Sequence, residues 1–205
     1  MIPLNTSDIT LVDRTMKRLP LVTLVLVALN LLAYLLELAA GGPAFCQAHG
    51  FVPARFMRDG DLGPALSSMF LHDPAGLVHL GGNMVCLAAF GAAVERALGS
   101  LRFTVLYFAA GVGGALAHAA VCPHATDALV GASGAIFGVL AAAGMLYPRT
   151  VGFVGAYAAF NIVSVILGTG GSVAVGAHVG GFVVGYFLTR VLFARTFRAF
   201  RFEVA

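Results

Sequence analysis

Residues 128–147 read ALVGASGAIFGVLAAAGMLY, twenty consecutive residues without a charged side chain. A helix that crosses a bilayer needs about 20 predominantly apolar residues, and this stretch meets that requirement. Five further apolar stretches of similar character lie at 19–40, 77–94, 103–121, 151–168 and 172–192. The sequence therefore predicts an all-α, polytopic membrane protein with six transmembrane helices.

The overall composition also favours a bilayer environment. Of the 205 residues, 60% are hydrophobic and 10% are charged, whereas soluble domains carry about 25% charged residues. A soluble fold of this size does not have enough interior to hide so much apolar surface. The net charge of +3 is not gathered in a basic stripe with interleaved aromatic residues. Nucleic acid is therefore not an expected partner.

The basic residues predict how the six stretches are oriented. Ten of the twelve Lys and Arg residues fall on the side that holds both termini, and only Arg55 and Arg58 fall on the other. Since loops rich in Lys and Arg stay in the cytoplasm, we expect both termini there. The predicted parts are a cytoplasmic tail (1–18), a membrane domain (19–194) and a second cytoplasmic tail (195–205).

Two features of the N-terminal part allow more than one interpretation. The first apolar stretch follows basic residues, as a cleaved signal peptide would, but its apolar core is close to 20 residues long. Signal peptides usually have 7–15 apolar residues, so a retained helix is favoured.

The loop 41–76, called the outer loop below, is rich in Phe, Leu and Met. Its apolar content predicts a small structured element at the membrane surface rather than a loose connector.

Polar side chains occur at selected positions of three stretches. His79 and Asn83 are spaced i, i+4 in the second stretch, so they share one helical face. Ser133 lies in the fourth stretch and His178 in the sixth. A serine that attacks, a histidine that takes its proton and donors that hold an oxyanion are the groups that acyl transfer requires. Because polar groups are costly in a membrane, these four residues are candidates for a site.

Each of these residues also has an ordinary structural explanation. A serine in a membrane helix usually bonds a carbonyl one turn earlier or a neighbouring helix. His178 alone fits a packed histidine or part of a proton path, and His79 fits a hydrated residue at the membrane boundary. A Gly-x-Ser-Gly pattern alone is weak, because small residues are abundant in this chain.

The combination of motifs is more specific than any one of them. The chain has FLH at 70–72, HLGGNM at 79–84, GAAVERALG at 91–99, GASGAIFG at 131–138 and AHVGG at 177–181. In their order and spacing, these motifs resemble the rhomboid intramembrane serine proteases over about residues 19–192. The outer loop departs from some members, which have a Trp-Arg pair, because this chain has no tryptophan.

The resemblance implies a six-helix rhomboid-like bundle and a role for each motif residue. Ser133 is the implied nucleophile and His178 its general base, without an acidic third member. The implied oxyanion and substrate-binding residues are Asn83, His79 and Gly131, together with the backbone N–H of Ser133. The implied supporting residues are Phe137, Gly134 and Gly181.

Local spacing adds three expectations. Gly134 and Gly138 are spaced i, i+4, as are Gly181 and Gly185. If these smooth faces meet, two helices approach closely enough for His178 to reach Ser133. Phe137, one turn after Ser133, is placed to pack on the ring of His178. Residues 122–129 form a candidate loop that dips into the membrane and brings water to the site.

The predicted function is intramembrane cleavage of single-span membrane proteins through a Ser133–His178 dyad and an acyl-enzyme, in a bacterial inner membrane. The three cysteines form no CxxC pair and no metal-ligand spacing. No metal or organic cofactor is implied. One alternative is a non-catalytic relative that binds membrane clients, although such relatives usually lack the serine or the histidine. A transporter with a histidine proton path is disfavoured, since the two halves show no internal repeat. The oligomeric state is left open.

Overall fold

The computed structural model describes residues 18–73, 76–166 and 175–192. Helices dominate these residues, and the described part contains no strand beyond one isolated bridge between Phe51 and Leu129. The all-α fold class predicted from the sequence is confirmed. Both predicted tails, apart from Arg18, lie outside the described residues, as do residues 167–174, where the fifth predicted stretch ends and the sixth begins.

Among the described residues, six helical segments form the bundle, and each overlaps one of the six apolar stretches. Three of them are long and apolar enough to cross a membrane: α2 (Leu21–Ala39), the segment Leu77–Leu98 and α8 (Ser100–Val121). The second consists of α6 (Leu77–Cys86), a π-helical turn η1 (Leu87–Gly91) and α7 (Ala92–Leu98). The shorter segments are α9 (Ser133–Leu146), α10 (Val151–Ile166) and α11 (Val175–Phe187), the last continued by η3 (Leu188–Leu192). The count of six transmembrane spans remains a prediction.

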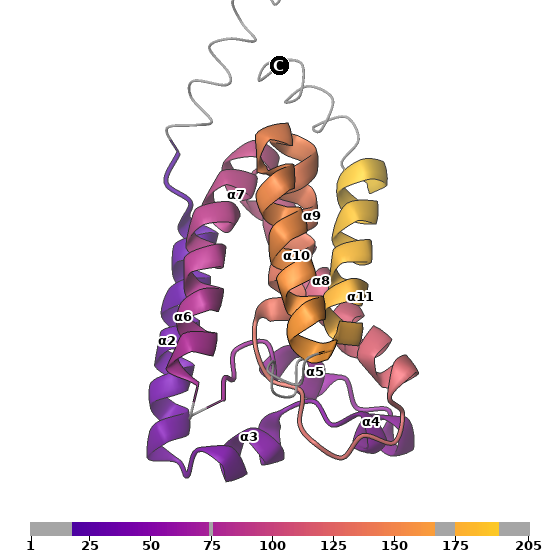
Figure 1. The fold of residues 1–205 in the computed structure, drawn as a ribbon. Coiled ribbons are helices and arrows are strands. Elements are labelled where there is room, and N and C mark those ends of the chain that lie inside the picture. The colour runs from indigo at the N-terminus through magenta and orange to yellow at the C-terminus, as the bar shows by residue number, and fades with distance from the viewer. Residues whose placement is uncertain (1–17, 74–75, 167–174, 193–205) are drawn as a thin grey trace, which may run out of the picture.

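The connections between helices alternate between two ends of the bundle (Figure 1). The link from α7 to α8 and the short 3₁₀ turn η2 (Pro148–Thr150) between α9 and α10 lie at the end where α2 begins and α11 finishes. Arg96 is near this end, and its Nε donates to the carbonyl oxygen of Arg18 at 3.2 Å. The outer loop lies at the opposite end. Successive connections thus lie at opposite ends of the bundle, as the distribution of Lys and Arg predicts. Which end faces the cytoplasm remains a prediction.

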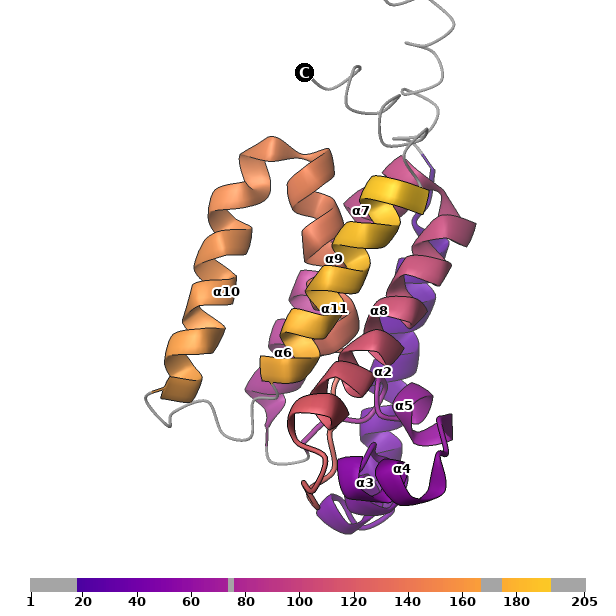
Figure 2. The same ribbon diagram turned by 90° about the vertical axis from the view of Figure 1, so that its right-hand side faces the viewer.

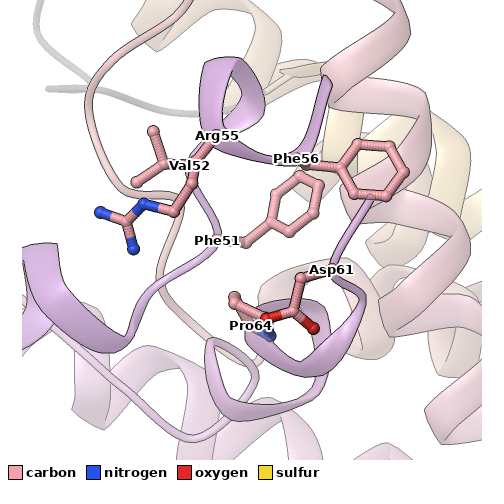
Figure 3. Close-up of a pocket in the computed structure, with 6 residues that line it drawn as sticks. All are labelled: Phe51, Val52, Arg55, Phe56, Asp61 and Pro64. Carbon is pink, nitrogen blue, oxygen red and sulfur yellow. The ribbon is translucent and has the colours of Figure 1, made fainter. Parts of the chain in front are cut away.

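The outer loop is folded, as its apolar content predicts. It contains the short helices α3 (Pro43–His49), α4 (Pro53–Asp59) and α5 (Gly63–Ser67). Phe51 is fully buried and packs with Ala65 and with Ala115 and Ala119 of α8. Figure 3 shows its ring beside Phe56, with the ring centroids 5.4 Å apart. The cavity there measures about 10 Å³, roughly the room for one water, so the loop is close-packed.

The structure corrects the predicted start of the fourth helix. The sequence suggested a helix from Ala128, but α9 begins at Ser133. Leu129 instead exchanges two backbone hydrogen bonds with Phe51, at 3.1 and 2.8 Å, and the Gly131 N–H donates to the Ser68 carbonyl at 2.9 Å. Gly131 also has a φ of +118°, which a helix does not allow and which favours glycine. The helical prediction for 128–132 is wrong because these backbone groups are bonded to the outer loop.

The central helix of the bundle is α9. Every residue from Gly134 to Ala143 is buried, and α8 and α11 pack against this helix. The two glycine pairs meet as their spacing predicts: a Cβ added to Gly181 would collide with the carbonyl oxygen of Gly134, and one added to Gly185 would collide with Gly138. The two helices are therefore in backbone contact, which a larger residue at these positions would prevent.

A buried carboxylate fixes α2 against the rest of the bundle. Glu95 of α7 is 2% exposed. Its two oxygens accept hydrogen bonds from the backbone N–H groups of Val22 and Thr23 at 3.0 and 2.8 Å, from the Thr23 hydroxyl at 2.8 Å and from the Ser100 hydroxyl at 2.8 Å. The first N–H groups of a helix have no partner within it, and the positive end of the helix dipole favours an anion.

Glu95→Ala is expected to destabilise the folded protein by about 2–4 kcal/mol, because it leaves buried donors unpaired at the start of α2. Asp59→Ala is the matched control, since Asp59 pairs with Arg58 on the surface at 2.7 Å. The free energy of unfolding in detergent micelles measures both changes. An equal, small loss for the two variants would contradict the role given to Glu95.

Gly181→Ala is expected to lower the thermal unfolding midpoint, because overpacking a tight contact typically costs about 1–3 kcal/mol. Gly155→Ala on α10 is the matched control, since a Cβ at Gly155 meets no atom within 4 Å. The control should leave the midpoint unchanged or raise it slightly, as alanine favours a helix over glycine. Equal midpoints for the two variants would show that α9 and α11 are not in backbone contact.

Candidate active site

The side chains of Ser133 and His178 meet at the contact between α9 and α11. The Ser133 Oγ lies 2.8 Å from the His178 Nε2, within the distance that a nucleophile and its base require. Ser133 is the first residue of α9, one position before Gly134. His178 lies three positions before Gly181 on α11. The glycine contact therefore brings the serine within reach of the histidine.

The imidazole of His178 is held by stacking. Its ring centroid lies 4.3 Å from that of Phe137, with an angle of 11° between the rings, which is the contact expected from the spacing of Phe137 and Ser133. If the serine hydroxyl donates to Nε2, the ring hydrogen is on Nδ1. That Nδ1 is buried and has no hydrogen-bond partner among the described residues. At rest, Ser133 and His178 thus form a two-residue pair, and the stacked ring of Phe137 holds the imidazole in place.

The side chains of His79 and Asn83 are close to Gly131, which precedes Ser133 by two residues. A Cβ added to Gly131 would lie 3.0 Å from Cε1 and 3.1 Å from Nε2 of His79, and 3.7 Å from Nδ2 of Asn83. A side chain at this position would thus press on the groups predicted to hold an oxyanion. Asn83 is 2% exposed, while His79 is partly exposed.

The start of α9 contributes backbone donors. The first N–H groups of an α-helix have no intrahelical acceptor, and the helix dipole makes this end attractive to negative charge. α9 has 14 residues and begins with Ser133. The Ser133 N–H is one of these first donors, and it lies on the same residue as the hydroxyl of the 2.8 Å contact.

Two further residues border this site and were not assigned to it from the sequence. His72, in the outer loop, has its Nε2 3.1 Å from Nδ2 of Asn83. Glu37, at the outer end of α2, binds the backbone of His72. Glu37 is visible in the sequence as a carboxylate in an otherwise apolar stretch. Its contact with His72 is not, because the two residues are 35 positions apart. By contrast, His118 of α8 lies beside Gly176, and its Nδ1 finds no partner in the described part of the chain.

An apolar cavity borders the histidine. It has a volume of about 200 Å³ and is lined by Phe137, Ala158, Val175, His178, Val179, Phe182 and Val183. Figure 2 shows α10 standing apart from α11 on this side of the bundle. Among the described residues, no group of three or more His, Cys, Asp or Glu side chains is arranged to hold a metal ion.

Comparison with known proteins identifies relatives that match most of the chain. The rhomboid protease GluP of Bacillus subtilis (strain 168) is 33% identical over 190 residues, covering 84% of this chain and 35% of that protein. The RHOMBOID-like proteins 5 and 4 of Arabidopsis thaliana are 30% and 36% identical, covering 71% and 73% of this chain and 49% and 39% of their own lengths. The chain thus spans between about a third and a half of these relatives.

A family comparison covers the site itself. The model of the Rhomboid domain matches residues 59–195, which is more than half of the chain. The matched segment contains Asn83, Ser133 and His178, together with the helices that position them. The chain therefore belongs to the rhomboid family, whose members are integral membrane proteins.

Proposed function

We propose that this protein is an intramembrane serine endopeptidase that cleaves the transmembrane segments of other membrane proteins. The observation that carries the proposal is the 2.8 Å contact between the Ser133 hydroxyl and the His178 imidazole at the start of α9. Membership of a family that includes a bacterial rhomboid protease, 33% identical to this chain, supports the same reaction. An isolated structural serine would have no need of a histidine aligned by a ring stack.

The reaction follows from the positions of these groups. Ser133 Oγ attacks the carbonyl carbon of the scissile peptide while His178 Nε2 takes the hydroxyl proton. The carbonyl oxygen becomes an oxyanion, which the Ser133 N–H, Asn83 and His79 stabilise. The C–N bond then breaks, and His178 gives its proton to the departing amine. Water, deprotonated by His178, hydrolyses the ester of the acyl-enzyme and restores the free serine.

The length of α9 supports a site below the membrane surface. With 14 residues, the helix is roughly 21 Å long at 1.5 Å per residue, whereas the hydrocarbon core is about 30 Å thick. Because α9 begins at Ser133 and is shorter than the hydrocarbon core, a helix whose last residue lies near one membrane surface places Ser133 below the other surface. The non-helical residues 122–132 lead from the outer end of α8 to this point, and such backbone is tolerated where it lines a wet cavity.

The proposed substrates are single-span membrane proteins. Hydrolysis of a peptide bond within a helix requires that the helix unwind locally, so small or helix-breaking residues near its outer end favour cleavage. The apolar cavity of about 200 Å³ beside His178 offers room for apolar side chains next to the reacting groups. The proposed location is a bacterial inner membrane, with both termini in the cytoplasm and the outer loop on the other side.

Ser133→Ala and His178→Ala are both expected to abolish covalent labelling by a fluorophosphonate, a reagent that phosphonylates activated serines. The first variant lacks the nucleophile, and the second lacks the base that activates it. Intact mass of the purified protein in detergent measures the label. Labelling of Ser133→Ala as complete as that of the wild type would refute the assignment, and an inert wild type would favour the alternative of a client-binding relative.

Asn83→Ala is expected to slow phosphonylation of Ser133 by about 10²–10³-fold while the reagent still binds, because removal of one oxyanion donor has an effect of this size. Gln47→Ala, on α3, is the amide control, since the Gln47 side chain is exposed and binds the backbone of Thr126 and Ala128. The time course of labelling at several reagent concentrations separates the maximal rate from reagent affinity. A maximal rate equal to that of the wild type would exclude Asn83 from the oxyanion site.

A further inference from the structure

His72 lies in a buried polar chain that links the first helix to the proposed oxyanion site. The side chains of His72 and Glu37 are both 0% exposed. The His72 backbone N–H donates to the Glu37 carboxylate, at 3.0 Å to Oε2 and 3.2 Å to Oε1. The Cys46 thiol of α3 lies 3.4 Å from the His72 carbonyl oxygen and 3.7 Å from Glu37 Oε2. The backbone of His72 is therefore fixed on both sides by neighbours from α2 and α3.

The hydrogen bonds of the ring define its tautomer. The His72 Nδ1 lies 3.3 Å from the carbonyl oxygen of Phe70, and a carbonyl oxygen only accepts hydrogen bonds. The ring hydrogen is therefore on Nδ1. Burial lowers the pKa of His72 to about 4, and the neighbouring His79, with its ring 5.3 Å away, acts in the same direction. The ring is thus neutral near pH 7, and its Nε2 has a free lone pair.

This lone pair faces the amide of Asn83. The His72 Nε2 lies 3.1 Å from Asn83 Nδ2, so it accepts one of the two N–H bonds of the amide. Among the described residues, Nδ2 has no second hydrogen-bond partner, so its other N–H is available, and Nδ2 lies near Gly131, two residues before Ser133. A rotated amide would turn its own oxygen toward the lone pair of Nε2, which is repulsive. It would also remove the N–H donors from the vicinity of Gly131.

We infer that His72 is a positioning residue, which orients the Asn83 amide so that an N–H, and not the oxygen, is presented to the oxyanion. The inference rests on the proposed function, since it gives His72 an effect only through Asn83. Glu37 and Cys46 are the buried groups that hold His72 in place. Asp73 is its neighbour in the chain, and His79 is the ionisable group that faces it from α6.

A double-mutant cycle tests this inference, with fluorophosphonate labelling of Ser133 as the measurement. His72→Phe keeps a ring but removes Nε2, and it is expected to lower the maximal labelling rate by about tenfold, the factor that corresponds to one lost hydrogen bond. In an Asn83→Ala background the same change should have no further effect, because no amide is left to orient. A purely structural role for His72 would reduce the rate in both backgrounds.

A conservative variant and a matched control complete the experiment. His72→Gln places an amide oxygen near the position of Nε2 and should retain most of the wild-type rate. His124→Ala removes an exposed histidine from the loop before α9 and should change nothing. Should His72→Phe not give folded protein, His72→Leu takes its place in the cycle.

The outcomes separate the two proposals. A wild type that is not labelled contradicts the proposed protease activity itself. A labelled wild type with an unchanged rate in His72→Phe overturns the positioning role and leaves the protease proposal standing. An equal fractional loss of labelling rate in the wild-type and Asn83→Ala backgrounds also overturns the positioning role. A loss in the wild-type background alone, together with a rate near wild type for His72→Gln, supports the positioning role.

Discussion

The backbone contact between α9 and α11 is the constraint on which the rest of the structure depends. Ser133 and His178 lie on different helices, and their 2.8 Å contact is formed where the backbones of the two helices meet. Glycines at positions 134, 138, 181 and 185 remove the side chains that would keep the helices apart. In a bilayer, where lipid offers no hydrophobic drive for helix association, such close packing is itself a main source of stability. One contact therefore serves both the fold and the proposed chemistry.

Two buried carboxylates at the ends of the bundle supply partners for backbone N–H groups in the membrane interior. Water is scarce there, so each buried donor or acceptor needs a partner from the protein. Glu95 satisfies the start of α2 at one end of the bundle, and Glu37 satisfies the backbone of His72 at the other. Both carboxylates bind N–H groups across a long sequence separation. They connect α2 to the second helical segment and to the outer loop, and in this way α2 supports a site to which it contributes no reacting group.

Local patterns in the sequence were sufficient to predict most of each helix and to single out polar side chains that the structure brings close together, and insufficient for the contacts between distant segments. The i, i+4 spacing of His79 and Asn83, and of the glycine pairs, is visible within one helix, and the structure brings these residues together. The start of α9 at Ser133 was missed because hydrophobicity continues through Ala128, while the helix is interrupted by bonds from Leu129 to Phe51 and from Gly131 to Ser68. The contacts of His72 with Glu37 and Asn83 were not predicted, because the three residues come from separate segments of the chain.

The absence of an acidic residue beside His178 among the described residues has a physical explanation in this setting. A carboxylate at that depth would carry a large desolvation cost, and an ion pair often fails to recover it. In the proposed reaction, the imidazole needs orientation at rest and stabilisation of positive charge only while it holds the serine proton. A phenyl ring stacked at 4.3 Å supplies the first by packing. It also supplies part of the second, because the face of an aromatic ring attracts a cation, an effect that strengthens when water is excluded. Phenylalanine achieves both without adding a polar group that the membrane interior would have to satisfy.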